Sequence, residues 1–189
     1  ESIKIKPAIR MLQSLEEKGE ISAGRTQIIE SSSGNLGVAA SLACSTKGYR
    51  FTCISDPNIS SRNEKYIKLF GAELVIVKDR DQNGGFLNSR IDLIKRLLKE
   101  DKNLFWLNQY ANCEKKNAHY LSTAPSIFES FSEVDYLFIG AGTTGTLMGC
   151  AEYIRDNKLK TKVIAVDTFG SVTFDLPSSK RYIPGLCLT

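Results

Sequence analysis

The sequence has 189 residues, of which 42% are hydrophobic and 24% charged, and it carries a net charge of +4 at pH 7. This composition predicts a globular chain with a buried core, and its interleaved basic and acidic residues lack the clustered basic face of a nucleic-acid-binding protein. No apolar run reaches membrane-spanning length and no signal peptide opens the chain, so we expect a cytoplasmic protein with neither nucleic acid nor membrane as a partner.

The cysteines do not indicate a metal centre. They are Cys44, Cys53, Cys113, Cys150 and Cys187. None belongs to a C-x-x-C pair, and His119 is the only histidine. Most lie in apolar contexts, which predicts buried, reduced thiols and no metal site.

The first predicted element is a helix. Pro7 suits a first helical turn, the apolar residues 8–15 follow helical spacing, and Gly19 can end the helix. This arrangement places Lys4 at or just before the helix N-terminus.

Short apolar runs then alternate with helical patterns. The predicted strands are 26–30, 49–55, 73–78, 104–107, 136–139 and 162–167, and the further helices are 36–47, 61–70, 86–98, 117–130 and 146–156. This alternation predicts βαβ units and parallel sheets. The polar stretch 113–116 is interpreted as a hinge between two lobes. Because the chain opens at Lys4 and stops without a closing element, we expect a fragment, truncated at both ends.

The turn Ser31-Ser32-Ser33-Gly34-Asn35-Leu36-Gly37 joins a predicted strand to a predicted helix. Backbone N–H groups at a helix start favour an anion. One serine is enough to cap the helix, which is the simpler interpretation, and the surplus hydroxyls could bind an amino-acid carboxylate.

The loop Gly140-Ala141-Gly142-Thr143-Thr144-Gly145-Thr146 has two further interpretations besides a capped turn. It satisfies G-x-G-x-x-G after a strand, and Asp167 ends the next strand, as in dinucleotide-binding domains. Its threonines would instead suit a terminal phosphate monoester. An amine at Lys4, a carboxylate site and a phosphate site are together what a pyridoxal phosphate enzyme needs, although Lys4 alone could be a solvated surface residue.

Two more stretches supply polar groups. Gln109 and Tyr110 follow a predicted strand, at the edge where open α/β sheets bind ligands. Arg90 lies early in a predicted helix and could bind phosphate or carboxylate, although a surface ion pair is the alternative. His119 is interpreted as a packing residue.

These motifs resemble the cysteine synthase branch of the fold type II, tryptophan synthase β-like, pyridoxal phosphate enzymes. Ser2-Ile3-Lys4 is similar to the family's lysine motif, so the resemblance implies that Lys4 binds the cofactor covalently and is catalytic. Residues 32–37 resemble the Thr-Ser-Gly-Asn-Thr-Gly loop, in which Ser32, Ser33 and Asn35 would contact substrate and Asn35 also the cofactor.

The remaining motifs fit the same family. Gln109 matches its carboxylate-binding glutamine. The stretch Gly142-Thr143-Thr144-Gly145-Thr146 resembles its Gly-Thr-Gly-Gly-Thr phosphate cup. The resemblance implies two three-layer α/β/α lobes with parallel sheets. These would be 1–112, with a mobile subdomain at about 55–98, and 113–189, part of a larger cofactor-binding lobe. It also implies a homodimer.

Within that branch, stretches 30–37, 56–60, 108–112 and 166–174 are most similar to the 2,3-diaminopropionate biosynthesis synthases. These relatives join O-phospho-L-serine to L-glutamate for siderophore and peptide-antibiotic pathways, and a partner dehydrogenase cleaves the product. The resemblance therefore implies the same β-replacement here, with Arg90 and Tyr110 as candidates for recognising the leaving phosphate.

The sequence departs from the sulfhydrylase pattern at three positions. Leu36 replaces a threonine, Thr144 replaces a glycine, and Cys187 stands where relatives have glycine. The serine that faces the cofactor's ring nitrogen would lie beyond Thr189. The first two changes argue against O-acetylserine. A sulfide-using cysteine synthase, an NAD-dependent dehydrogenase domain and a non-enzymatic binding protein remain as alternatives.

Overall fold

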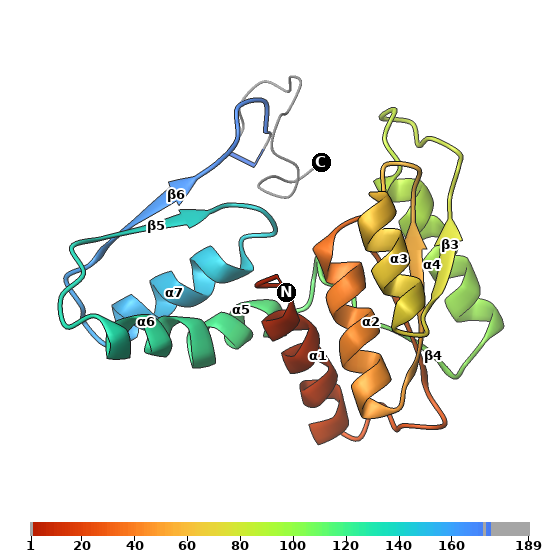
Figure 1. Cartoon of the computed structure of the whole chain (residues 1–189), viewed down its shortest axis with the longest axis horizontal. Helices are drawn as coiled ribbons and strands as arrows, with labels where there is room; N and C mark the ends of the chain where they lie inside the picture. Colours follow the sequence, from red (N-terminus) through yellow and green to blue (C-terminus); the bar gives the residue numbers. More distant parts are fainter. Residues whose placement is uncertain (1, 172, 175–189) are drawn as a thin grey trace. The chain divides into compact units, whose positions relative to one another are not determined.

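Two groups of parallel strands organise the chain in the computed structural model, which describes residues 2–171, 173 and 174 (Figure 1). The chain divides into two compact units, Glu1–Asn112 and Cys113–Thr189. Cys187 and residue 172 of the stretch 166–174 lie outside the described residues.

Unit 1 contains a four-stranded parallel sheet in the order β3-β2-β1-β4. Its strands are β1 (Gln27–Ser31), β2 (Arg50–Ser55), β3 (Glu73–Ile76) and β4 (Leu104–Trp106), and its helices are α1 (Ile5–Glu17), α2 (Asn35–Lys47), α3 (Ser61–Leu69) and α4 (Leu87–Glu100). Each predicted element of this unit is present, with ends shifted by at most two residues except at the start of α1.

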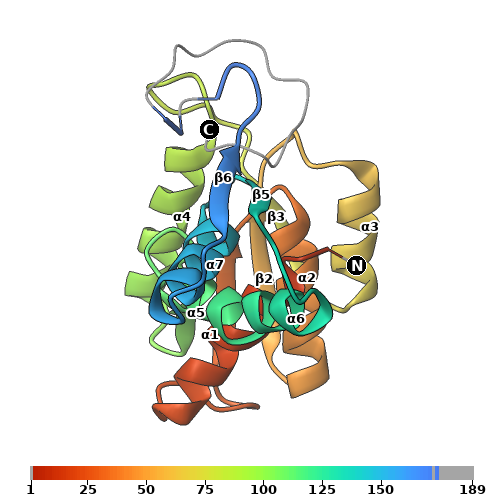
Figure 2. The same cartoon turned by 90° about the vertical axis from the view of Figure 1, so that its left-hand side faces the viewer.

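Helices cover both faces of this sheet, with α2 and α3 on one side and α4 on the other (Figures 1 and 2). Strand alternation explains this division, because successive side chains point to opposite faces. Ile28 pairs with Phe51, and both lie in the core formed with α1, α2 and α3. Ile29 pairs with Trp106 on the opposite face, where Ile94 of α4 completes a second core. Unit 1 is thus a three-layer α/β/α structure.

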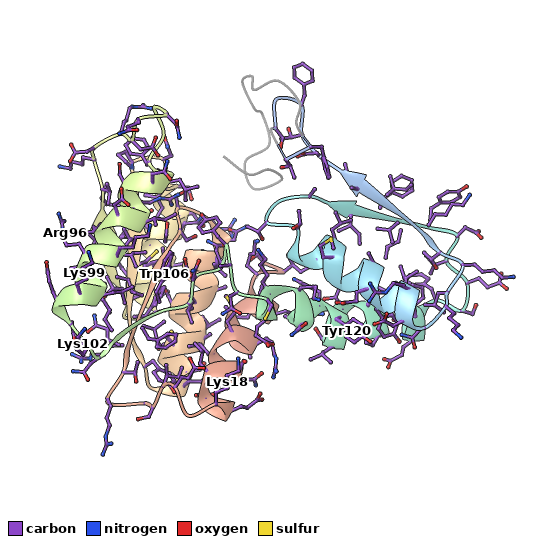
Figure 3. The ribbon with its side chains drawn as sticks, turned by 180° about the vertical axis from the view of Figure 1, so that it is seen from behind. Lys18, Arg96, Lys99, Lys102, Trp106 and Tyr120 are labelled. Atoms are coloured by element: carbon purple, nitrogen blue, oxygen red, sulfur yellow. The ribbon has the colours of Figure 1, made fainter. Side chains whose placement is uncertain are left out.

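Helix α4 is amphipathic, which accounts for its place on the sheet. Arg96 and Lys99 point outward from this helix, and Trp106 lies on the sheet face that the helix covers (Figure 3). At the other face, Gly48 ends α2 in the left-handed conformation with a φ of 75°, so the chain turns directly into β2. The apolar stripes therefore decide which face each helix covers.

Unit 2 contains a two-stranded parallel sheet, β5 (Tyr136–Gly140) and β6 (Lys162–Val166), with α7 (Gly145–Asp156) as the crossover helix. Helices α6 (Ala124–Ser130) and α7 pack on one face of it, around Ala124, Ile139 and Cys150. Tyr136, Phe138 and Ile164 on the strands are exposed. The described part of this unit therefore has two layers, where three were expected.

The polar stretch 113–116, interpreted from sequence as a hinge, begins where the two units divide, between Asn112 and Cys113. It is helical, because Cys113 directly precedes α5 (Glu114–Ala118). Polar residues suit the start of a helix as well as a connection between lobes, so the pattern alone does not reveal the helix.

The predicted helix 117–130 is also interrupted. A π-helical turn, His119–Thr123, separates α5 from α6. Pro125 explains the break, because its ring nitrogen has no hydrogen and cannot continue the α-helical hydrogen-bond ladder.

None of the described helices combines the length and apolar composition needed to cross a bilayer. Cys44, Cys53 and Cys150 are buried free thiols, as expected, whereas Cys113 is exposed.

Candidate functional site

The carboxyl ends of β1 and β4 form the point where the strand order of unit 1 reverses. The chain leaves β1 into α2 on one face and returns to β4 from α4 on the other face. Open α/β sheets bind ligands at such a switch point. The turn of residues 31–35 begins at the last residue of β1 and residues 108–110 follow β4, so the structure brings these two predicted parts of the site together.

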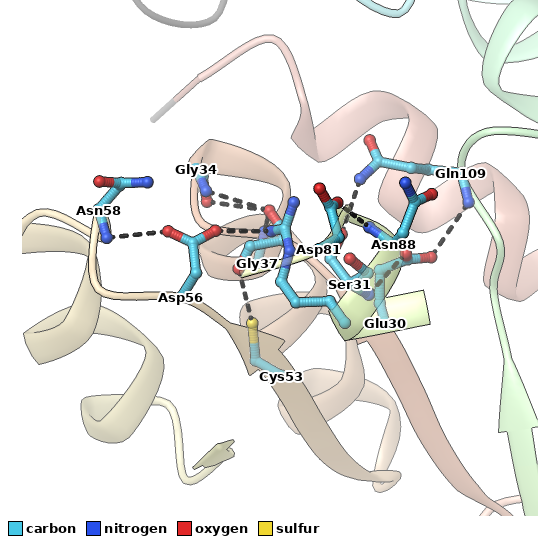
Figure 4. Close-up of polar contacts among 12 residues, drawn as sticks. Glu30, Ser31, Gly34, Gly37, Cys53, Asp56, Asn58, Asp81, Asn88 and Gln109 are labelled. Carbon is cyan, nitrogen blue, oxygen red and sulfur yellow. Dashed lines mark hydrogen bonds and ion pairs between the residues drawn. The ribbon is translucent and has the colours of Figure 1, made fainter. Parts of the chain in front are cut away.

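Glu30 links these two loops, a role that was not expected from the sequence. Its carboxylate is fully buried and accepts hydrogen bonds from Ser31 N at 2.7 Å and Gln109 N at 3.1 Å (Figure 4). It also accepts one from Trp106 Nε1 at 3.3 Å. The available signal was an acidic residue inside the apolar run Ile28-Ile29-Glu30, since an unpaired buried carboxylate would be costly.

Burial raises the pKa of the Glu30 carboxyl to about 7 from the usual 4.5, because the charged form is poorly solvated there. The hydrogen bonds from Ser31, Gln109 and Trp106 and the charge of Arg90 oppose this rise. The carboxyl is therefore expected to titrate near neutral pH.

Gln109 is held in a defined orientation. Its Nε2 donates to the Ser31 carbonyl at 3.0 Å, and its backbone N–H is bound by Glu30. One N–H of the Gln109 amide remains for a carboxylate. The preceding residue, Asn108, has a φ of 52°, which is uncommon outside glycine and is tolerated best by asparagine and aspartate. This local conformation turns the chain sharply after β4.

The three serines of the turn have different environments. Ser32 Oγ accepts hydrogen bonds from Gly34 N at 3.2 Å and Gly37 N at 3.0 Å, so this hydroxyl caps α2. The Ser33 and Asn35 side chains are half-buried and exposed, respectively, and neither is hydrogen-bonded to another described residue. Ser33 and Asn35 therefore have side-chain groups available for a ligand.

Arg90 is not a surface residue. It is 5% exposed, and its NH1 lies 3.3 Å from Asp56 Oδ2, with Asp56 itself 2% exposed. The sequence left open an ion pair of Arg90 on the surface. Arg90 does form an ion pair, with Asp56, but both side chains are buried. Asp56 Oδ1 also accepts from Asn58 N at 2.8 Å, which fixes the carboxylate just after β2.

Several buried polar atoms gather at this edge of the sheet without well-formed hydrogen bonds. They are Ser31 Oγ, Ser55 Oγ and the Nε and NH1 atoms of Arg90. The Tyr110 hydroxyl interacts with Ser31 and Arg90, and burial raises the pKa of Tyr110, so it remains a neutral donor. A guanidinium, hydroxyls and a phenol that converge in this way suit an anion.

Lys4 is the N-cap residue of α1, as predicted, and is half-buried. Its backbone N–H donates to Ser2 Oγ at 3.3 Å. Helices α1 and α2 run in the same direction, and their N-terminal ends lie toward the carboxyl ends of the strands (Figure 1). Lys4 therefore lies at the same end of unit 1 as the serine turn.

In unit 2, the residues Gly142, Thr143, Thr144, Gly145 and Thr146 form the turn into α7. Thr144 has a φ of 58°, a strained conformation for a β-branched residue that costs about 1–2 kcal/mol. This is the position where the sequence has threonine in place of the glycine of similar loops, which explains the strain. Thr146 Oγ1 lies 3.2 Å from His119 Nε2.

This turn fits a phosphate group. It lies at the start of a 12-residue helix, and no acidic residue occupies the first turn of that helix. Backbone N–H groups at such a start, with threonine hydroxyls beside them, are donors suited to a phosphate monoester. Each unit by itself therefore offers groups of a kind that pyridoxal phosphate needs. Unit 1 has an amine at Lys4 and an exposed amide at Asn35, and unit 2 has the helix start with hydroxyls at Thr143 and Thr146, whereas the Thr144 hydroxyl donates to the Thr143 carbonyl at 2.8 Å.

Comparison with known proteins points to a family of pyridoxal phosphate enzymes. A family model described as "Pyridoxal-phosphate dependent enzyme" matches residues 1–184. An N-(2-amino-2-carboxyethyl)-L-glutamate synthase of Cupriavidus metallidurans is 37% identical over 98% of this chain. The chain spans about half the length of the curated relatives that it matches, 54% for this one.

Solved structures agree on the fold. An O-ureido-L-serine synthase superposes with a TM-score of 0.86 at 28% identity, covering 99% of this chain and 58% of its own. A cysteine synthase of Entamoeba histolytica gives 0.85 at 29% identity, covering 97% and 56%. The cysteine synthase-like resemblance and the parallel α/β fold are thus confirmed, and the dinucleotide interpretation of the loop at Gly140 is set aside.

Proposed function

Because the chain belongs to the pyridoxal-phosphate dependent enzyme family, we propose that it takes part in a β-replacement on O-phospho-L-serine with L-glutamate as the nucleophile. The C–O bond to phosphate breaks, and a C–N bond to the glutamate amine forms. The products are inorganic phosphate and N-(1-amino-1-carboxyl-2-ethyl)-glutamate, a precursor of 2,3-diaminopropionate for a siderophore or a peptide antibiotic. The 37% identity to an N-(2-amino-2-carboxyethyl)-L-glutamate synthase supports this choice.

The observation that carries the choice of O-phosphoserine is the buried anion-binding group around Arg90. The guanidinium is paired with Asp56 through NH1 at 3.3 Å, its Nε has no well-formed hydrogen bond, and it lies near Tyr110, beside the loops proposed to hold the substrate. A phosphate ester carries up to two negative charges, whereas an acetyl ester carries none. Such a group therefore favours the phosphorylated substrate.

The carboxylate of the amino acid would be held by the turn after β1 and the loop after β4. Ser33 offers a hydroxyl, Gln109 its remaining amide N–H, and the first turn of α2 its backbone N–H groups. Ser32 contributes by capping α2 and so fixing the shape of this turn.

Lys4, Asn35 and the turn Gly142–Thr146 are the residues that would hold the cofactor. The bound cofactor supplies an electron sink, which lets the α-carbon of the amino acid lose its proton. The amine of Lys4 is positioned at a helix N-terminus and would take that proton. We also propose that residues 55–98, which include Arg90, close over the substrate and exclude water.

A sulfide-using cysteine synthase is the second candidate, favoured by the similarity to the Entamoeba histolytica enzyme. A cytoplasmic homodimer is proposed for either activity by analogy with this family.

The test supplies the purified whole protein with O-phosphoserine plus glutamate, and separately with O-acetylserine plus sulfide. We expect phosphate release and the glutamate adduct, measured by mass spectrometry, from the first mixture. Turnover of the second mixture alone would replace this proposal with the cysteine synthase.

Tyr110→Phe tests the anion-binding group. It removes one hydroxyl donor to a charged group, so the KM for O-phosphoserine should rise roughly tenfold, with less than a twofold change for O-acetylserine. Tyr49→Phe is the matched control. Tyr49 directly precedes β2, at the amino end of the strand and away from the proposed site, and its hydroxyl donates a hydrogen bond to Glu16 at 3.1 Å. An equal effect of Tyr110→Phe on both substrates would contradict phosphate recognition by this residue.

A further inference from the structure

His119 joins the threonine turn of unit 2 to the π-helical turn. The imidazole is 2% exposed, with Nε2 3.2 Å from Thr146 Oγ1 and Nδ1 2.9 Å from Thr123 Oγ1. Both ring nitrogens therefore contact a threonine hydroxyl. A residue that only filled space would not need two such contacts, so the packing role expected from sequence is incomplete.

The backbone of the unit is arranged to allow this contact. A Cβ on Gly149 would lie 2.5 Å from the Lys116 carbonyl oxygen and 2.8 Å from His119 Cβ, so only glycine lets α7 approach the His119 segment this closely. His119 is also the first residue of the π-helical turn. Such turns are rare and occur often at functional sites.

The direction of the hydrogen bonds decides what Thr146 can offer to a ligand. A neutral imidazole has one N–H donor and one acceptor nitrogen. If Nε2 carries the hydrogen, it donates to Thr146 Oγ1, and the Thr146 hydroxyl hydrogen is available for another acceptor. If Nδ1 carries it, the Thr146 hydroxyl is drawn to Nε2, and the turn presents only oxygen lone pairs there.

We propose that His119 is a positioning residue that carries its hydrogen on Nε2 and directs the hydroxyl hydrogen of Thr146 toward a phosphate monoester at the start of α7. Thr123 would donate to Nδ1 and so complete the relay Thr123–His119–Thr146–phosphate. The inference rests on the proposed role of the Gly142–Thr146 turn in holding the cofactor phosphate, and it adds a residue outside that turn.

The test compares the affinity of the whole protein for pyridoxal phosphate with its affinity for pyridoxal, which lacks the phosphate. His119→Phe keeps a ring but removes both nitrogens. It should weaken pyridoxal phosphate binding roughly tenfold, as expected for a lost hydrogen bond to a charged group, with less than a twofold change for pyridoxal. His119→Gln, which can still place an N–H near Thr146, should restore most of that affinity.

Thr146→Val should give the same selective loss, and the double variant should be no weaker than Thr146→Val alone, because both residues act through one hydroxyl. Thr146→Ser is the matched control and should retain the affinity. Nitrogen-15 NMR of the cofactor-loaded wild-type protein should show the hydrogen on Nε2, which also provides a test if His119→Phe does not fold.

Two results separate this inference from the proposed cofactor site. A selective loss for Thr146→Val with none for His119→Phe, or a hydrogen found on Nδ1, would overturn the positioning role and leave the phosphate site intact. No selective loss for either variant would mean that the phosphate lies elsewhere, which would overturn both.

Discussion

Ionisation of Glu30 should make the stability of unit 1 depend on pH in the neutral range. Its pKa is raised from 4.5 to about 7 in the folded protein by burial, so the folded state binds the proton more tightly than the unfolded state. The resulting stability is fully present below pH 4.5 and is lost as the pH rises through 7. The pKa difference is about 2.5 units, and one unit corresponds to ~1.36 kcal/mol, so the change in unfolding free energy is ~3 kcal/mol.

Trp106 offers a direct assay, because its indole N–H donates to Glu30 and it is the single tryptophan of the sequence. We expect a fluorescence transition of the native protein with a midpoint near pH 7. Burial also raises the pKa of Cys53, to about 12, and that of Tyr110, so neither neighbour should titrate there.

The matched variants are Glu30→Gln and Glu129→Gln. The first removes the titrating group and should abolish the transition. In urea titrations, the unfolding free energy of the wild-type protein should fall between pH 5 and 8, and Glu30→Gln should not show this decrease. The second changes an exposed glutamate and should leave both unchanged. An unaltered transition in Glu30→Gln would refute the reasoning.

Two further substitutions test the packing of α7 and the turn that precedes it. Gly149→Ala should lower the unfolding free energy by about 2–4 kcal/mol, because the new methyl group meets the Lys116 backbone, while Met148→Ala on the exposed side should cost less than about 1 kcal/mol. Thr144→Gly should raise the unfolding free energy by about 1 kcal/mol, because glycine relieves the strain at a φ of 58°. A lower unfolding free energy in urea titrations would show that Thr144 is not strained.

The order and type of the regular elements could be predicted because hydrophobic periodicity and glycine terminators act locally. Gly48 ends α2 directly after the predicted helix 36–47, and the apolar alternation at Ile28 and Ile29 assigns the two faces of β1. The π-helical turn was missed, although Pro125 was a visible reason for a break in the helix.

Long-range contacts explain what the sequence could not reveal about the site. The burial of Arg90 depends on Asp56, which is distant in sequence and approaches it only when α4 crosses the sheet. Glu30 was included in an apolar strand, since nothing local shows that three donors converge on its carboxylate. The positions of Lys4 and the serine turn, in contrast, followed from helix starts alone.

We propose that Lys4 binds pyridoxal phosphate covalently. Borohydride reduction of the cofactor-loaded whole protein, followed by peptide mass spectrometry, locates the attachment. We expect a pyridoxyl group on the Lys4 amine of the wild-type protein and none in the Lys4→Ala variant. A label on a different lysine, or a protein that takes up no cofactor, would contradict it.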